Sequence, residues 1–337
     1  MNTIIKNTKR DTAIDILKGW SIMAIMLLHY ENGLFSETVN VWFGSFMVSS
    51  FYLTAAWVMT LRPLPTLKDA FSKLWRSLGW PYISFSLIIC LFSTLLCLCG
   101  QMEWEILIRD IYKFLCLRGI GTLWFLPALF FGEILFLFFI RKKLPVKFLI
   151  LGITMVYTAC YWRWYYNYRE ASTIMKIIDA PLNALWRICN AWVSIAVFYA
   201  FAKSCREQMN ELSKRQLIFS AFVLLSIYTI LIASSLLSQY TLITGWLGPI
   251  GLFFLAKATN SLFINYPFEY FGRNSLIVMA VHFSILQQLC IVINRNLTGQ
   301  LALTGWTAIG YYAMSVLLII PIIKLFSNNQ FIHIALR

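Results

Sequence analysis

Two side chains that can do chemistry, Lys18 and His29, flank an apolar stretch near the N-terminus. The segment reads DILKGWSIMAIMLLHYENG over residues 15–33. An α-helix turns about 100° per residue, so a spacing of eleven residues makes about three turns. Both side chains then share one helical face, about 16 Å apart along the axis. Imidazole suits general-base chemistry near neutral pH, so the spacing predicts a site along this face with His29 as its base.

Each of these two residues also has a purely structural explanation. Lys18 alone could extend to the lipid headgroups, and His29 alone could make a structural hydrogen bond near the opposite surface. Their alignment favours function, because an ionisable group inside a membrane helix normally faces a cavity or a partner. Asp15 lies three residues before Lys18 and is expected to pair with it.

Further polar side chains lie in later apolar segments. Glu133 is a carboxylate whose unpaired burial would be costly, so we assign it to the catalytic group, with a buried ion pair as the alternative. His282 follows Ser275 by seven residues on the same helical face, which predicts two substrate-binding groups or a structural histidine. Trp124 is predicted either to stack on a substrate or to lie at the membrane interface.

The composition indicates an integral membrane protein. Of the 337 residues, 60% are hydrophobic and 12% are charged, whereas soluble domains carry about 25% charged residues. The net charge of +14 is spread over short loops between apolar segments. That distribution argues against nucleic-acid binding, which needs a continuous basic face. The eight cysteines contain no CxxC pair, so the sequence predicts no metal site.

Ten apolar segments have about the length needed to span a membrane. They predict an all-α protein with about ten transmembrane helices in one bundle and a single domain over residues 1–337. The segments are 13–31, 39–61, 79–99, 122–140, 146–163, 184–202, 215–233, 240–257, 272–293 and 305–326. Alternate loops are rich in Lys and Arg, which predicts that these loops and both termini lie in the cytoplasm. Lys73 and Arg76 lie in one of these loops.

Four stretches, in this order along the chain, resemble the acyltransferase-3 class of membrane acyltransferases. Lys18 and His29 resemble its first-helix signature of a basic residue, ten residues and a histidine. The stretches FSKLWRSLGWPY (71–82), GTLWFLPALFFGEILF (121–136) and FEYFGRNSLIVMAVHFSIL (268–286) resemble its basic pair before a proline, its Leu-Trp-Phe-Leu helix start and its late Gly-x-x-Ser-Leu helix with a histidine. One departure is Ala55-Ala56, where many members have Ser-Gly.

The resemblance implies transfer of an acyl group, usually acetyl, from acetyl-CoA to an acceptor. It implies that Lys18, Lys73 and Arg76 bind the phosphates of this donor and that His29 activates the acceptor hydroxyl, by direct transfer or through an acyl-histidine. The implied acceptor is a sugar of a surface polysaccharide or its lipid-linked precursor, and the implied location is the bacterial plasma membrane, in contact with its lipids.

Other classes of membrane protein predict different features. A transporter or flippase for lipid-linked saccharides is the main alternative, and it predicts inverted repeats with matching interrupted helices. The glycine-rich segment 240–257 has no evident mate of this kind. A polysaccharide polymerase predicts large external loops. A membrane scaffold gives no reason for the alignment of Lys18 with His29.

Overall fold

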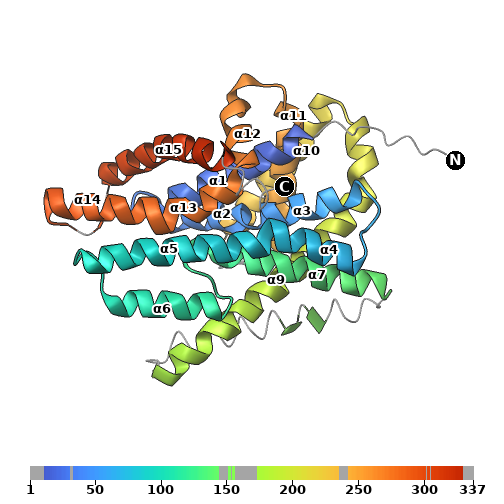
Figure 1. The fold of residues 1–337 in the computed structure, drawn as a ribbon. Coiled ribbons are helices and arrows are strands. Elements are labelled where there is room, and N and C mark those ends of the chain that lie inside the picture. Colours follow the sequence, from blue (N-terminus) through green and yellow to red (C-terminus); the bar gives the residue numbers. More distant parts are fainter. Residues whose placement is uncertain are drawn as a thin grey trace.

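The computed structural model describes residues 11–30, 33–143, 151–152, 154–155, 173–234, 242–300, 302–303 and 305–328. Within those ranges the regular elements are all helical, and none of these residues forms a strand. Most of the helices run side by side in one bundle (Figure 1). The predicted all-α membrane fold is therefore confirmed.

The described elements follow one another in this order along the chain. They are α1 (Thr12–Tyr30), α2 (Glu37–Met47), α3 (Ser49–Thr60), α4 (Leu67–Leu74), the π-helical turn η1 (Trp75–Gly79), α5 (Trp80–Leu98), α6 (Trp104–Leu115), the short helix η2 (Gly121–Trp124), α7 (Phe125–Arg141), α9 (Thr173–Glu211), α10 (Lys214–Ala233), α11 (Leu242–Thr259), the short helix η3 (Phe263–Asn265), α12 (Tyr266–Arg273), α13 (Ser275–Val281), the π-helical turn η4 (His282–Gln287), α14 (Gln288–Thr298) and α15 (Gly305–Asn328).

Eight helical stretches in the described residues are long and apolar enough to cross a membrane. They coincide with eight of the ten predicted segments. Helix α11 matches the predicted segment 240–257, but its apolar part, Ile243–Thr259, is shorter. The predicted segment 146–163 lies mostly outside the described residues, so the total of about ten stays a prediction.

The third predicted segment, 79–99, begins too late. The structure continues it backwards through η1 and α4, so that one helical stretch runs from Leu67 to Leu98. The start is set by Thr66, whose hydroxyl accepts a hydrogen bond from the backbone N–H of Asp69 at 3.1 Å. Lys73 and Arg76 therefore lie on a helix rather than in a loop.

The predicted segments also imply a loop between 79–99 and 122–140, and the structure differs there as well. Residues of this loop form α6, which packs beside α5 and returns along it (Figure 1). The Tyr82 hydroxyl donates to the carbonyl of Phe114 at 2.7 Å, so α6 ends level with the middle of the long helical stretch. Polar residues of α6 pair locally, as Lys113 does with Asp110 at 2.7 Å. This local pairing lets a charged segment pack against an apolar helix.

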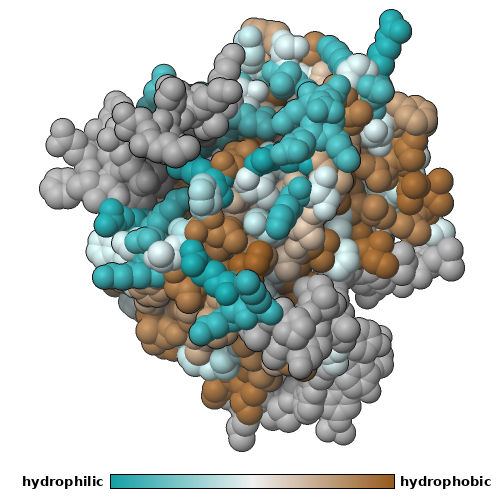
Figure 2. All heavy atoms as spheres, turned by 90° about the vertical axis from the view of Figure 1, so that its right-hand side faces the viewer, coloured by the Kyte–Doolittle hydropathy of each residue, from teal (hydrophilic) through white to brown (hydrophobic). Residues whose placement is uncertain are grey.

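Hydrophilic side chains gather at one end of the bundle. Figure 2 views the right-hand end of Figure 1 and shows hydrophilic residues across that face, with hydrophobic residues at its sides. Two arginines bind the end of α3 and the segment after it. Arg141 donates to the carbonyls of Leu64 and Pro65 at 2.8 Å each, and Arg206 donates to the carbonyl of Thr60. The excess of cationic residues predicts that this end faces the cytoplasm.

Candidate functional site

Helices α1 and α12 approach each other through two glycines. A Cβ atom on Gly19 would overlap the backbone of Phe268, and one on Gly272 would overlap the carbonyl group of Asp15. Only glycine allows two backbones to come this close. The contact fixes the connection between α12 and α13 against the Lys18 end of α1.

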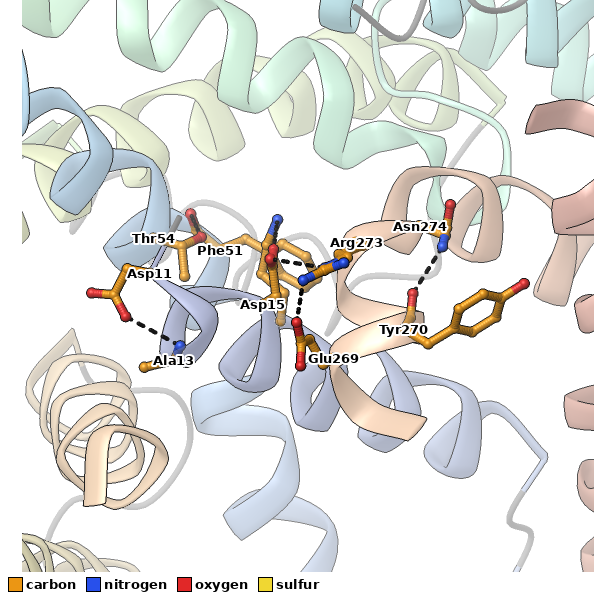
Figure 3. Close-up of polar contacts among 10 residues, drawn as sticks. Asp11, Ala13, Asp15, Phe51, Thr54, Glu269, Tyr270, Arg273 and Asn274 are labelled. Carbon is orange, nitrogen blue, oxygen red and sulfur yellow. Dashed lines mark hydrogen bonds and ion pairs between the residues drawn. The ribbon is translucent and has the colours of Figure 1, made fainter. Parts of the chain in front are cut away.

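A buried carboxylate, Asp15, lies at this contact and joins two cations. Its side chain is 2% exposed, with one oxygen 3.3 Å from Nζ of Lys18 and the other 3.5 Å from Nε of Arg273. Figure 3 shows Arg273 reaching from α12 to Asp15 while it also bonds to Glu269. The expected pairing of Asp15 with Lys18 is present. The side chain of Arg273 is 46% exposed, and its guanidinium is shared between the carboxylates of Asp15 and Glu269.

At the other end of α1, His29 meets His282. Nδ1 of His29 lies 3.1 Å from Nε2 of His282. The other ring nitrogen of His282, Nδ1, lies 2.8 Å from the carbonyl oxygen of Val278. His282 is fully buried, whereas His29 is partly exposed. His29 is therefore the member of the pair that a substrate can reach.

Neighbouring polar groups hold the two histidines in place. The side-chain amide of Gln287 donates to the backbone carbonyl of His29. The Tyr30 hydroxyl lies 2.6 Å from the hydroxyl of Ser315 and 3.4 Å from the backbone carbonyl of His282. Both backbones are thus fixed by buried hydrogen bonds in addition to the contact between the rings.

The segment before α7 packs against the same region. The ring of Phe283 lies 4.6 Å from the ring of His29. It also faces Gly121, where an added Cβ would come within 2.7 Å of the Phe283 ring. Thr122 donates its hydroxyl to the carbonyl of Met279 at 2.6 Å. Non-helical backbone inside a membrane domain is tolerated where it is buried in protein or lines a cavity. The start of α7 is therefore anchored next to the histidine pair.

Trp124 follows directly and carries a cation on its ring. The guanidinium of Arg187 on α9 lies 4.1 Å from the ring centroid. Arg187 also donates to the carbonyl of Arg118 at 3.4 Å, and Arg118 pairs with Asp179 at 3.3 Å. One face of Trp124 is thus covered, so a stacked substrate would have to use the other face.

Glu133 lies on α7 beside the helix that carries Lys73. It is half-buried, and α4 with Lys73 packs against α7. In the described part of the chain, Glu133 makes no hydrogen bond to His29, whose ring contacts His282 instead. Lys73 and Arg76 are both exposed, so their charges remain accessible.

Ser275 and His282 lie at the two ends of α13. Ser275 begins α13 two residues after Arg273, whereas His282 follows the end of this helix and contacts His29. Seven residues of helix separate them by about 10 Å. Ser275 thus belongs to the Asp15 end of the site and His282 to the His29 end.

A family model described as an acyltransferase domain matches residues 11–324. The chain belongs to the acyltransferase-3 family. No curated protein and no solved structure matches it significantly. The matched range contains α1 and the His282 turn, so both ends of the site lie within the acyltransferase-3 domain. Together with the apolar helices, the match identifies a multi-pass membrane acyltransferase.

Sequence reasoning missed Arg273 and Gln287 as members of the candidate site. Arg273 carried one usable signal, because it directly precedes the late helix that contains Ser275 and His282. Gln287 carried none, since its contact with His29 joins helices far apart in sequence. Among the described residues, no group of three His, Cys, Asp or Glu side chains is arranged to hold a metal ion.

Proposed function

We propose that this acyltransferase transfers an acetyl group from acetyl-CoA to a hydroxyl of a surface-polysaccharide sugar, or of its lipid-linked precursor, in the bacterial plasma membrane. The observation that carries the proposal is the arrangement on α1. Lys18 shares the buried carboxylate of Asp15 with Arg273, and a partly exposed imidazole, His29, lies about 16 Å further along the same face of α1. A long, thin donor can extend between two such points.

The cations suit the phosphates of coenzyme A. Charge-assisted hydrogen bonds to phosphate are among the strongest in proteins, and Lys18, Lys73 and Arg76 would supply them. We add Arg273, whose guanidinium can bind two phosphate oxygens at once, as the ammonium of Lys18 cannot. Asp15 neutralises part of this charge and holds the two cations together when no donor is bound. The pantetheine arm would then run along α1 toward His29.

The reaction needs a base at the far end. As the acceptor hydroxyl oxygen bonds to the thioester carbonyl carbon, its proton passes to His29 and the carbon–sulfur bond breaks. The imidazolium then returns this proton to the coenzyme A thiolate, so the products are an O-acetyl ester and the free thiol. A variant in which His29 is first acetylated conserves the same atoms.

Trp124 is the residue that we assign to the acceptor. The face of its ring opposite Arg187 would stack on a sugar ring, while Arg187 holds the indole in place. Glu133, on the helix that packs beside α4 and Lys73, would help to set the field around the donor. Trp124 and the histidine pair are connected through Gly121 and Phe283, which supports one continuous site.

The test compares cells that carry the wild type, His29→Ala, His333→Ala or no copy of the gene. His333 is the chain's third histidine, and its replacement serves as the matched control. The acetyl content of surface glycans is measured by mass spectrometry at equal membrane levels of each protein. We expect the wild type and His333→Ala to add acetyl groups and His29→Ala to resemble the null strain. General-base catalysis contributes about 10²–10⁴-fold.

Two results would contradict the proposal. Normal acetylation by His29→Ala would make this histidine structural. A wild type that adds no acetyl group but changes glycan export would favour the transporter.

A further inference from the structure

We propose that His282 is a positioning residue that decides which nitrogen of His29 carries the proton. It would keep the proton on Nδ1 and leave the lone pair on Nε2 for the acceptor hydroxyl. This inference rests on the proposed role of His29 as the base, but it concerns a ground-state property that can be measured without any activity.

The hydrogen bonds of His282 determine its own tautomer. Its Nδ1 lies 2.8 Å from the carbonyl oxygen of Val278. A carbonyl oxygen can only accept, so Nδ1 of His282 must carry a hydrogen. The residue is fully buried, and among the described residues no carboxylate is bonded to it or to His29. A buried imidazole without a counter-charge is neutral, so its Nε2 has a lone pair and must accept.

That lone pair fixes His29 in turn. Nδ1 of His29 lies 3.1 Å from Nε2 of His282. Because the latter accepts, the former must donate, and Nε2 of neutral His29 is left unprotonated. Gln287 binds the backbone carbonyl of His29. Tyr30 lies within hydrogen-bond distance of the backbone carbonyl of His282. These two bonds hold the backbone at both histidines, which keeps the two rings within reach of each other.

The chain of hydrogen bonds has a direct chemical consequence. Nε2 of His29 takes the acceptor proton, and the new imidazolium keeps donating from Nδ1 to His282. A hydrogen bond becomes stronger when its donor is charged, so the contact with His282 favours the state in which the proton has moved. Free imidazole side chains prefer the opposite tautomer, in which Nε2 carries the proton and cannot act as a base. Loss of His282 would therefore shift His29 toward that unproductive form, opposed by the backbone hydrogen bond between the His29 ring and Ile25.

The first experiment observes the tautomers directly. The wild-type protein, labelled with ¹⁵N in its histidine rings, is placed in lipid bilayers and studied by solid-state NMR at neutral pH. The chain has three histidines, so His333→Ala and His282→Gln suffice to assign the signals. We expect a protonated Nδ1 and an unprotonated Nε2 for both His29 and His282. A protonated Nε2 on neutral His29 would overturn the inference, whatever the protein's activity.

The second experiment tests the catalytic consequence. His282→Gln keeps an acceptor oxygen near the position of Nε2, whereas His282→Leu fills similar space without one. We expect the Leu variant to lower kcat for acetyl transfer about 10²-fold with little change in KM for acetyl-CoA, because the cations near Lys18 are untouched. The Gln variant should recover at least about tenfold of this loss.

Controls separate positioning from folding and from the proposed function. Both variants are compared with the wild type for membrane level and thermal unfolding. Equal rates in the wild type and Leu variant, or equal losses in folded Leu and Gln variants, would overturn the inference. If the Leu variant fails to fold, the wild-type NMR result decides. A wild type with the expected tautomers but no acetyl transfer would refute the proposed function alone.

Discussion

Replacing Gly19 with alanine tests how closely α1 and α12 approach each other. The new Cβ would lie 2.8 Å from Cα of Phe268 and nearer still to that residue's carbonyl group. Ordinary contacts of a Cβ lie at 3.4–4 Å. The obstructing atoms are backbone and cannot rotate away, so the two helices must separate by about an ångström.

The magnitude follows from two opposing terms. Overpacking of this kind typically destabilises a protein by about 1–3 kcal/mol, and a backbone obstruction belongs at the upper end. Alanine in place of glycine within a helix returns about 0.5–1 kcal/mol. We therefore expect Gly19→Ala to lower the free energy of unfolding by about 2–2.5 kcal/mol. Helix α12 leads into α13 and His282, and a displacement of about 1 Å at a catalytic group can reduce the rate about 10²-fold.

Gly310→Ala on α15 is the matched control, because no atom lies within 4 Å of its added Cβ. It retains the favourable helix term and should stabilise the protein slightly. The assay compares the thermal unfolding midpoints of both purified variants in one detergent, together with acetyl transfer. If Gly19→Ala raises the midpoint as much as Gly310→Ala and keeps full activity, the close approach of α1 and α12 is refuted.

Two further substitutions probe the two ends of the site. Thr122→Val removes the donor to the buried carbonyl of Met279 and should lower the free energy of unfolding by about 1–3 kcal/mol. Thr122→Ser keeps the donor, so thermal unfolding should show a much smaller loss of stability for this variant. Arg273→Gln removes a partly exposed cation but leaves His29 intact. In steady-state kinetics we therefore expect KM for acetyl-CoA to rise about tenfold, equivalent to about 1.4 kcal/mol, while kcat stays unchanged. An unchanged KM would exclude Arg273 from the donor site.

Features set by local geometry could be predicted from the sequence. The alignment of Lys18 with His29 and the pairing of Lys18 with Asp15 lie within one helix, where a fixed rotation per residue decides which side chains are neighbours. Most of the helices could also be predicted, because an uninterrupted run of about 20 apolar residues is itself a local feature of the sequence. Even the missed start of α4 had a readable signal, since Thr66 and Asp69 have the spacing of a helix N-cap with an acid in the first turn.

Contacts between distant segments could not be predicted in this way. His29 and His282 are 253 residues apart in sequence, and their meeting depends on how α1 packs against the late helices. Composition placed Glu133 and His282 inside apolar segments but did not say which of them would reach His29. The return of α6 along α5 was hidden as well, because its charges resemble those of an exposed loop.

The π-helical turn η4 explains why His29 is held from two directions. His282 and Gln287 are five residues apart and both contact residue 29, one through its ring and the other through its backbone carbonyl. In a regular α-helix, five residues rotate by about 500°, which leaves the two side chains about 140° apart. In a π-turn the hydrogen bonds run from residue i to i+5, so these two positions come close to alignment. The extra residue in this turn therefore lets one helix both orient the imidazole of His29 and fix its backbone.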